Sequence, residues 1–180
     1  RSGWKDRWRV DWGFYQPILR MAKARGLGML ALNAPSEITQ VVSKKGLDAL
    51  SESERAELPE LDLKNDSHHA FFLRTMEETK HPMPEGGMER MYTSMVIWDE
   101  TMAHNVAKWL KTDKRRKVMI IAGLGHCRND GVAGRIRRRG IEDVVSVRPV
   151  IVEGPGTIAD LLVRPEADFL WVMTAEETSA

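Results

Sequence analysis

The alternation of short apolar runs with amphipathic segments constrains the fold of this chain more than any other feature of its sequence. Apolar runs of strand length occupy residues 28–34 (GMLALNA) and 118–122 (VMIIA). Segments with apolar side chains at helical spacing flank both runs. Strands that alternate with helices favour a layered arrangement, so we predict an α/β fold with a mostly parallel sheet flanked by helices.

Local signals place the individual elements along the chain. Helices are predicted over residues 15–25, 36–45, 69–80 and 88–111, with a helical turn near 51–57 and a basic helix that ends near residue 140. The strongest periodicity lies in 88–111, where seven apolar residues, mostly methionine and tryptophan, recur every three or four positions. Further strands are predicted over 144–152, where Pro149 favours an edge or a bulge, and over 169–173. So few strands make a thin sheet, which predicts a fold that is incomplete at its N-terminus.

Charge and composition exclude several classes of protein. The 27 Lys and Arg residues balance 26 Asp and Glu residues, so we expect no nucleic acid among the partners. No apolar run approaches the roughly 20 residues that a membrane-spanning helix needs. Cys127 is the only cysteine, which excludes an intrachain disulfide framework and a cysteine-rich metal site.

The N-terminus differs in character from the rest of the chain. Residues 1–12 (RSGWKDRWRVDW) are basic and rich in tryptophan, so we predict a separate N-terminal segment there and a single α/β domain over 13–180. Three of its tryptophans suit a contact surface: Trp4, Trp8 and Trp12.

The loop after the second apolar run concentrates polar chemistry. Residues 123–134 (GLGHCRNDGVAG) hold four glycines together with His126 and Arg128. Ligands of open parallel sheets bind outside the carboxyl ends of the strands, and glycines let backbone amides approach a ligand closely. The loop lacks the Lys-Ser/Thr ending of a Walker loop and the spacing of a dinucleotide fingerprint. It is therefore either a plain turn or a ligand site in which His126 binds iron or moves protons.

The helix predicted over 88–111 carries a second group of candidates. Asp99 shares a helical face with Tyr92, so its carboxylate lies either at the wet edge of the apolar stripe or turned inward toward a site. A tyrosine oxygen is a known haem ligand, although an amphipathic boundary residue is the commoner role. Glu100 and His104 have the spacing of a surface pair. Met95 belongs to a stripe that forms either core or the wall of a pocket for a flat cofactor.

Two further features have both a structural and a functional interpretation. Asn33 ends the first apolar run, where it either caps the next helix or faces a ligand. The basic run 135–139 (RIRRR) is most simply a solvated helix face, and alternatively a clamp on carboxylates.

Five segments, taken together and in order, resemble the haem-binding ChaN-like family, whose members include iron-regulated lipoproteins. They are residues 15–22 with Gly26 (YQPILRMA…G), 30–35 (LALNAP), 46–59 (GLDALSESERAELP), 98–103 (WDETMA) and 122–126 (AGLGH). The wider superfamily includes Tiki-type and TraB-type proteins and erythromycin esterases, and its Gly-x-x-His element matches Gly123 to His126. Residues 1–12 do not match the N-terminal strand that family members usually carry.

The resemblance implies a haem-binding protein of iron uptake or handling, in the cell envelope, with a homodimer that stacks haem between its subunits. It implies Tyr92 or His126 as the iron ligand, with Arg128, Met95 and Asn33 as further cofactor-binding candidates. A hydrolase of the wider superfamily is the alternative. In that case His126 and the acids Asp99 and Glu100 would activate water, with or without a metal.

Overall fold

A computed structural model describes residues 4, 8, 10–79, 83–152, 155–163 and 166–174. The chain divides into two compact units, Arg1–Leu32 and Asn33–Ala180. The boundary suggested after residue 12 by composition remains a prediction.

Helix α2 (Trp12–Ala24) occupies most of the described part of the first unit. The side chain of Asp11 caps this helix by accepting a hydrogen bond of 2.6 Å from the amide of Gly13. The ring of Trp4 packs against Trp8 and Trp12, with centroids 5.0 and 4.9 Å apart. The predicted helix is therefore confirmed, with an earlier start, and the tryptophans form an aromatic cluster beside it.

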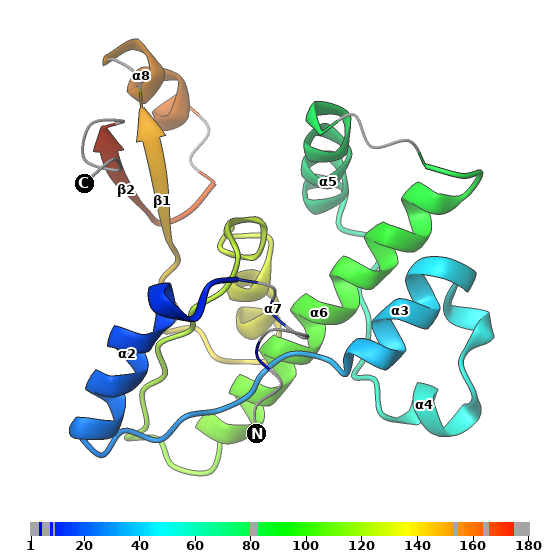
Figure 1. The fold of residues 1–180 in the computed structure, drawn as a ribbon, viewed down its shortest axis with the longest axis horizontal. Coiled ribbons are helices and arrows are strands. Elements are labelled where there is room, and N and C mark those ends of the chain that lie inside the picture. The colour runs from blue at the N-terminus through cyan, green and yellow to red at the C-terminus, as the bar shows by residue number, and fades with distance from the viewer. Residues whose placement is uncertain are drawn as a thin grey trace. The chain divides into compact units, whose positions relative to one another are not determined.

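The second unit holds most of the helices (Figure 1). They are α3 (Ser36–Lys45), α4 (Glu52–Ala56), α5 (Asp66–Glu78), α6 (Gly87–Leu110), α7 (Val132–Arg138) and α8 (Pro155–Val163), with two short 3₁₀ turns, η1 (Leu47–Ala49) and η2 (Leu124–His126). Helices α3, α5 and α7 all contact the long helix α6. The predicted helices are confirmed, and α8 is additional.

Two apolar clusters fix the helices around α6. Ile38 and Val42 of α3 pack on Ile97, and all three side chains are buried. Phe72 of α5 packs on Tyr92 and Val96 in the second cluster. Met88, Met91 and Met95 of the apolar face predicted for α6 pack beside this second cluster and are partly buried, whereas Met102 is buried.

A small parallel sheet accounts for the strands. Strands β1 (Val147–Val152) and β2 (Phe169–Thr174) pair in parallel, and Pro149 lies opposite Trp171. Each strand has a free edge in this two-stranded sheet, which explains how Pro149 is accommodated. The α/β class and both C-terminal strands are therefore confirmed, in a unit that is mostly helical.

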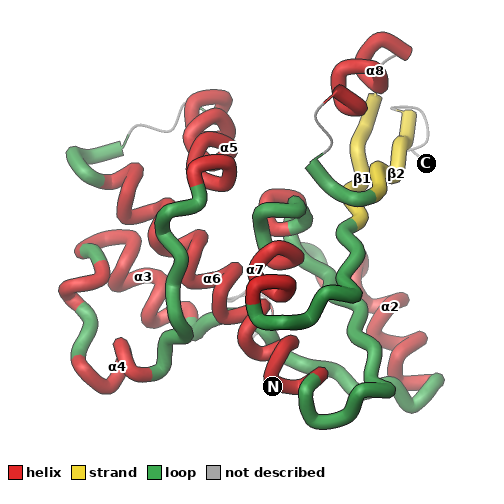
Figure 2. Tube along the Cα trace, turned by 180° about the vertical axis from the view of Figure 1, so that it is seen from behind, coloured by secondary structure: helices red, strands yellow, loops and turns green. Residues whose placement is uncertain are grey.

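The strands predicted over residues 28–34 and 118–122 are wrong (Figure 2). Both runs are drawn as loop, and neither pairs with a strand among the residues that the structure describes. Met119, in the second run, is 87% exposed. An apolar run becomes a strand only when a neighbour supplies the backbone hydrogen bonds, and periodicity carries no information about that neighbour. Across the described residues, no helix is long and apolar enough to cross a membrane.

Candidate functional site

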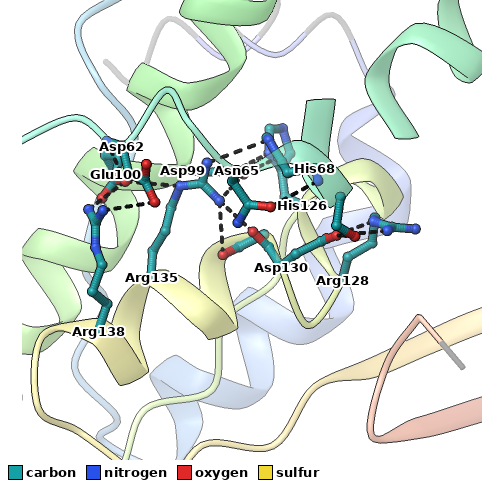
Figure 3. Close-up of polar contacts among 12 residues, drawn as sticks. Asp62, Asn65, His68, Asp99, Glu100, His126, Arg128, Asp130, Arg135 and Arg138 are labelled. Carbon is teal, nitrogen blue, oxygen red and sulfur yellow. Dashed lines mark hydrogen bonds and ion pairs between the residues drawn. The ribbon is translucent and has the colours of Figure 1, made fainter. Parts of the chain in front are cut away.

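A fully buried carboxylate, Asp99, lies at the centre of the polar network in the second unit. Asp99 projects from the middle of α6, and its side chain is 0% exposed. Its Oδ1 lies 2.5 Å from Nδ1 of His126, and its Oδ2 lies 3.0 Å from Nε2 of His68. Figure 3 shows these side chains converging from three elements. The carboxylate of Asp99 is therefore turned inward and does not lie at the wet edge of the apolar stripe.

The environment of Asp99 keeps its carboxylate ionised. Burial raises the pKa of Asp99, but hydrogen bonds from His126 and His68 and the charge of Arg135 outweigh that effect, so the pKa lies below its ordinary value. An ionised carboxylate only accepts hydrogen bonds, so His126 donates to Asp99 through Nδ1. His126 therefore carries a proton on Nδ1, and in the neutral ring Nε2 holds the lone pair.

His126 is the most accessible member of this network. Its side chain is 21% exposed, and among the described residues none bonds to Nε2. The ring lies nearly perpendicular to Trp98, with centroids 6.1 Å apart. A histidine that donates one ring N–H to a buried carboxylate and leaves the other nitrogen free has the geometry of a metal ligand or a general base.

Arg135 fixes the second histidine. Its Nη2 lies 3.5 Å from Nδ1 of His68, and a guanidinium can only donate, so Nδ1 accepts and Nε2 carries the proton. That proton faces Oδ2 of Asp99, which lies 3.0 Å from Nε2. The contact with Arg135 thus favours this tautomer of His68. His68 was not predicted as a site residue: the helix predicted over 69–80 leaves it out, whereas α5 begins three residues earlier, at Asp66. Asn65, which caps α5 by accepting from the amide of His68 at 3.0 Å, was the signal for the true start.

Tyr92 belongs to the same network but lies deeper. The residue is 2% exposed, and its hydroxyl lies 3.4 Å from Nδ1 of His68 and 3.4 Å from the carbonyl of Asn65. Burial raises the pKa of Tyr92 to about 12. A phenolate ligand would have to form against that shift, so iron binding by Tyr92 stays a prediction.

Glu100 lies next to Asp99 on α6 and is enclosed by arginines. Its side chain is 0% exposed and lies 3.2 Å from Arg135, 2.7 Å from Arg138 and 2.6 Å from Arg139. The expected surface pair of Glu100 with His104 and the expected solvated face of 135–139 are therefore wrong. These arginines do clamp a carboxylate, but it is the protein's own.

Two glycines pack tightly against backbone: Gly131, just before α7, and Gly134, within α7. A side chain at Gly131 would place its Cβ 2.7 Å from the carbonyl oxygen of His126, and one at Gly134 would lie 2.5 Å from that of Asn129. Both contacts are with backbone, so only glycine fits. The loop folds tightly on itself, and this packing holds His126 against Asp99.

An apolar groove of about 650 Å³ is lined by Leu124 and Gly125, the two residues before His126, which is not itself a lining residue. Its walls come from α5, α6, η2, α8 and the neighbouring strand and loop, through Phe71, Phe72, Arg74, Thr75, Met76, Glu78, Met95, Leu124, Gly125, Arg148, Leu161 and Glu166. Met95 therefore lines the groove, and Arg128 lies 4.0 Å above the ring of Phe71. Asn33 is exposed and does not cap α3, whose cap residue is Pro35.

The donor set of this region fits a haem group. A neutral imidazole with a free Nε2 is a common axial ligand of haem iron. A groove of this volume with aromatic and methionine walls is typical of sites for flat cofactors, which range over about 300–1,000 Å³. Arg74 and Arg148 on its wall supply cations for carboxylates. No group of three or more His, Cys, Asp or Glu side chains arranged to hold a metal ion occurs among the described residues.

Comparison with known proteins identifies the family. No curated protein and no solved structure matches the chain significantly. Residues 1–136 match the family model described as "Haem-binding uptake, Tiki superfamily, ChaN". That match covers Tyr92, Asp99, His126 and Arg135, the residues of the buried network. The chain belongs to the ChaN-like haem-binding uptake family of the Tiki superfamily.

Proposed function

We propose that this protein binds haem through Nε2 of His126, with the porphyrin against the adjoining apolar groove. The observation that carries the proposal is the 2.5 Å contact between His126 Nδ1 and the buried carboxylate of Asp99, with Nε2 left without a partner among the described residues. A carboxylate behind a ligating histidine orients the ring and raises its basicity. Family membership points to the same cofactor.

Each part of the network has a role in this proposal. Asp99 accepts the hydrogen bond from Nδ1 of His126 through Oδ1, and Nε2 of His68 contacts Oδ2 of Asp99. Met95 and Phe71 contribute apolar surface, while arginines at the groove receive the carboxylates. Haem, when bound, would supply a redox-active iron. The chain's own contribution is to hold the group, exclude water and fix the proton on Nδ1.

Haemin titration monitored at the Soret band tests the proposal. We expect a saturable shift of the band in the wild type and its loss in His126→Ala. Tyr92→Phe should retain the shift, because Tyr92 is buried and its pKa is raised to about 12. A shift lost in Tyr92→Phe and kept in His126→Ala would transfer the ligand role to tyrosine. No shift in any of the three proteins would contradict haem binding.

A hydrolase is the second candidate, because a histidine held by a buried aspartate is also the arrangement of a general base. His126 would take a proton from water and Asp99 would stabilise the resulting imidazolium. Glu100 is already enclosed by three arginines, so it has no part in this version. Metal analysis of fresh protein discriminates the two. A stoichiometric transition metal without a Soret band, lost in His126→Ala, would favour the hydrolase, whereas iron that accompanies a Soret band would favour haem binding.

The dimer, the lipoprotein character and the envelope location implied by the resemblance remain predictions. They are compatible with haem uptake, and each has a direct measurement in sedimentation, mass spectrometry of the native protein or cell fractionation.

A further inference from the structure

Three guanidinium groups gather around one carboxylate at the wall of the apolar groove. Glu166 contacts Arg128 through one oxygen and Arg148 through the other, and Arg74 lies 3.7 Å from the first. The amide of Asn129 donates a hydrogen bond of 2.7 Å to the carbonyl of Glu166, which ties this residue to the loop that carries His126. Glu166 and two of its arginines line the groove itself.

Arg128 is held in place by other contacts. Arg128 donates to both oxygens of Asp130, at 2.8 and 2.9 Å, and its guanidinium stacks 4.0 Å above Phe71. Its side chain is only 6% exposed. Figure 3 shows the paired bonds between Arg128 and Asp130. The position of the Arg128 guanidinium therefore does not depend on Glu166 alone.

The cluster places three guanidinium groups around one carboxylate that another acid could replace. Asp130 pairs with Arg128 and Glu78 lines the same groove, while Glu166 is the carboxylate that contacts all three arginines. Burial and the nearby charge of Arg128 lower the pKa of Arg148, as expected where like charges are held close together. A ligand with two carboxylates would supply more negative charge here than Glu166 does.

We infer that Arg74, Arg128 and Arg148 form a carboxylate-binding site whose present occupant, Glu166, competes with the acid group of an apolar ligand. The ligand's flat body would lie in the groove and its carboxylate would exchange with that of Glu166. This inference rests on the proposed function in so far as haem supplies those carboxylates. Arg148 and Glu166 lie outside the residues 1–136 matched by the family model.

Glu166→Gln tests the competition, because it removes the charge and keeps the shape. The probes are haemin, iron-free protoporphyrin IX and the dimethyl ester of protoporphyrin IX, titrated by fluorescence or absorbance into the full chain. We expect the variant to bind haemin and protoporphyrin IX about tenfold more tightly, the effect of one charge-assisted hydrogen bond exchanged between partners. Affinity for the dimethyl ester should not change, because the ester carries no carboxylate.

Matched variants separate this effect from a change in net charge. Glu142→Gln makes the same change at an exposed residue that does not line the groove, and it should leave every affinity unchanged. Arg74→Met, at a side chain that is 59% exposed, should weaken protoporphyrin IX binding without unfolding the protein.

The outcomes distinguish this inference from the haem proposal. Unchanged affinity of Glu166→Gln for both acids, an equal gain for the ester, or no binding of protoporphyrin IX to either protein would overturn the inference. Tighter protoporphyrin IX binding without any effect of His126→Ala on the haemin spectrum would retain the carboxylate site and contradict iron ligation by His126.

Discussion

At the scale of single residues, one buried carboxylate determines the chemistry of two histidines. Asp99 is ionised and accepts a hydrogen bond from Nδ1 of His126, while Nε2 of His68 lies 3.0 Å from its other oxygen. Arg135 contacts Nδ1 of His68, which places the proton of that ring on Nε2. The sequence identified Asp99 and His126 as candidates and gave a carboxylate clamp as one interpretation of the run 135–139. It did not predict the part of His68, because that part depends on contacts between helices that are far apart in the chain.

The lowered pKa of Asp99 predicts how stability depends on pH. A carboxyl group whose pKa is lower in the folded state stabilises the fold above its unfolded value, about 3.9, and loses that contribution as the pH falls through the folded pKa. The free energy of unfolding of the wild type should therefore decrease below about pH 4. Urea titrations across this range should show a flatter profile for Asp99→Asn.

Asp143→Asn is the control for this measurement, because Asp143 is exposed. It should reproduce the wild-type profile. Identical profiles for Asp99→Asn and the wild type would mean that Asp99 is not the group whose protonation destabilises the fold.

At the scale of elements, α6 positions the site by carrying Asp99 and Glu100 side by side. Asp99 bonds to the loop before α7 through His126, while Glu100 bonds to α7 through three arginines. The sequence predicted α3 and α6 nearly to the residue, since periodicity and the glycine after α3 are local signals. It misplaced the strands, because pairing depends on distant partners.

Glu100 is predicted to anchor α7. Glu100→Gln removes the buried negative charge that faces three arginines, of which Arg138 retains Asp62 and Arg135 retains Asp99 as acidic partners. We expect the free energy of unfolding to fall by about 3 kcal/mol, as is typical when one partner of a buried ion pair is removed. Urea denaturation measures this loss, and the exposed variant Glu142→Gln should show almost none. Equal stabilities of the two variants would contradict an anchoring role.

The loop geometry makes a second prediction at this scale. Gly131→Ala would place a methyl group 2.7 Å from the carbonyl oxygen of His126, so the loop must move. We expect a loss of about 1–3 kcal/mol in stability together with weaker haemin binding. Gly123→Ala in the same loop is the control, because its methyl group would meet His126 Cδ2 at an ordinary 3.6 Å. Similar behaviour of the two variants would show that the tight contact is not required.

At the scale of the whole molecule, the family match covers only part of the chain whose fold the structure describes. The match ends at residue 136, and the parallel sheet with α8 lies beyond it. Helix α8 was not predicted, although a proline at the first position, Pro155, is a recognised signal for the start of a helix. Ordered motifs were sufficient to identify the family, but the groove and its arginines depend on residues brought together from five elements.

Resonance Raman spectroscopy of the ferrous haem complex tests iron ligation by His126 most directly. The account predicts an iron–histidine stretching band that shifts on iron isotope substitution, moves to lower frequency in Asp99→Asn because the ring becomes less basic, and is absent in His126→Ala. The same band, unchanged in position in His126→Ala, would contradict the account.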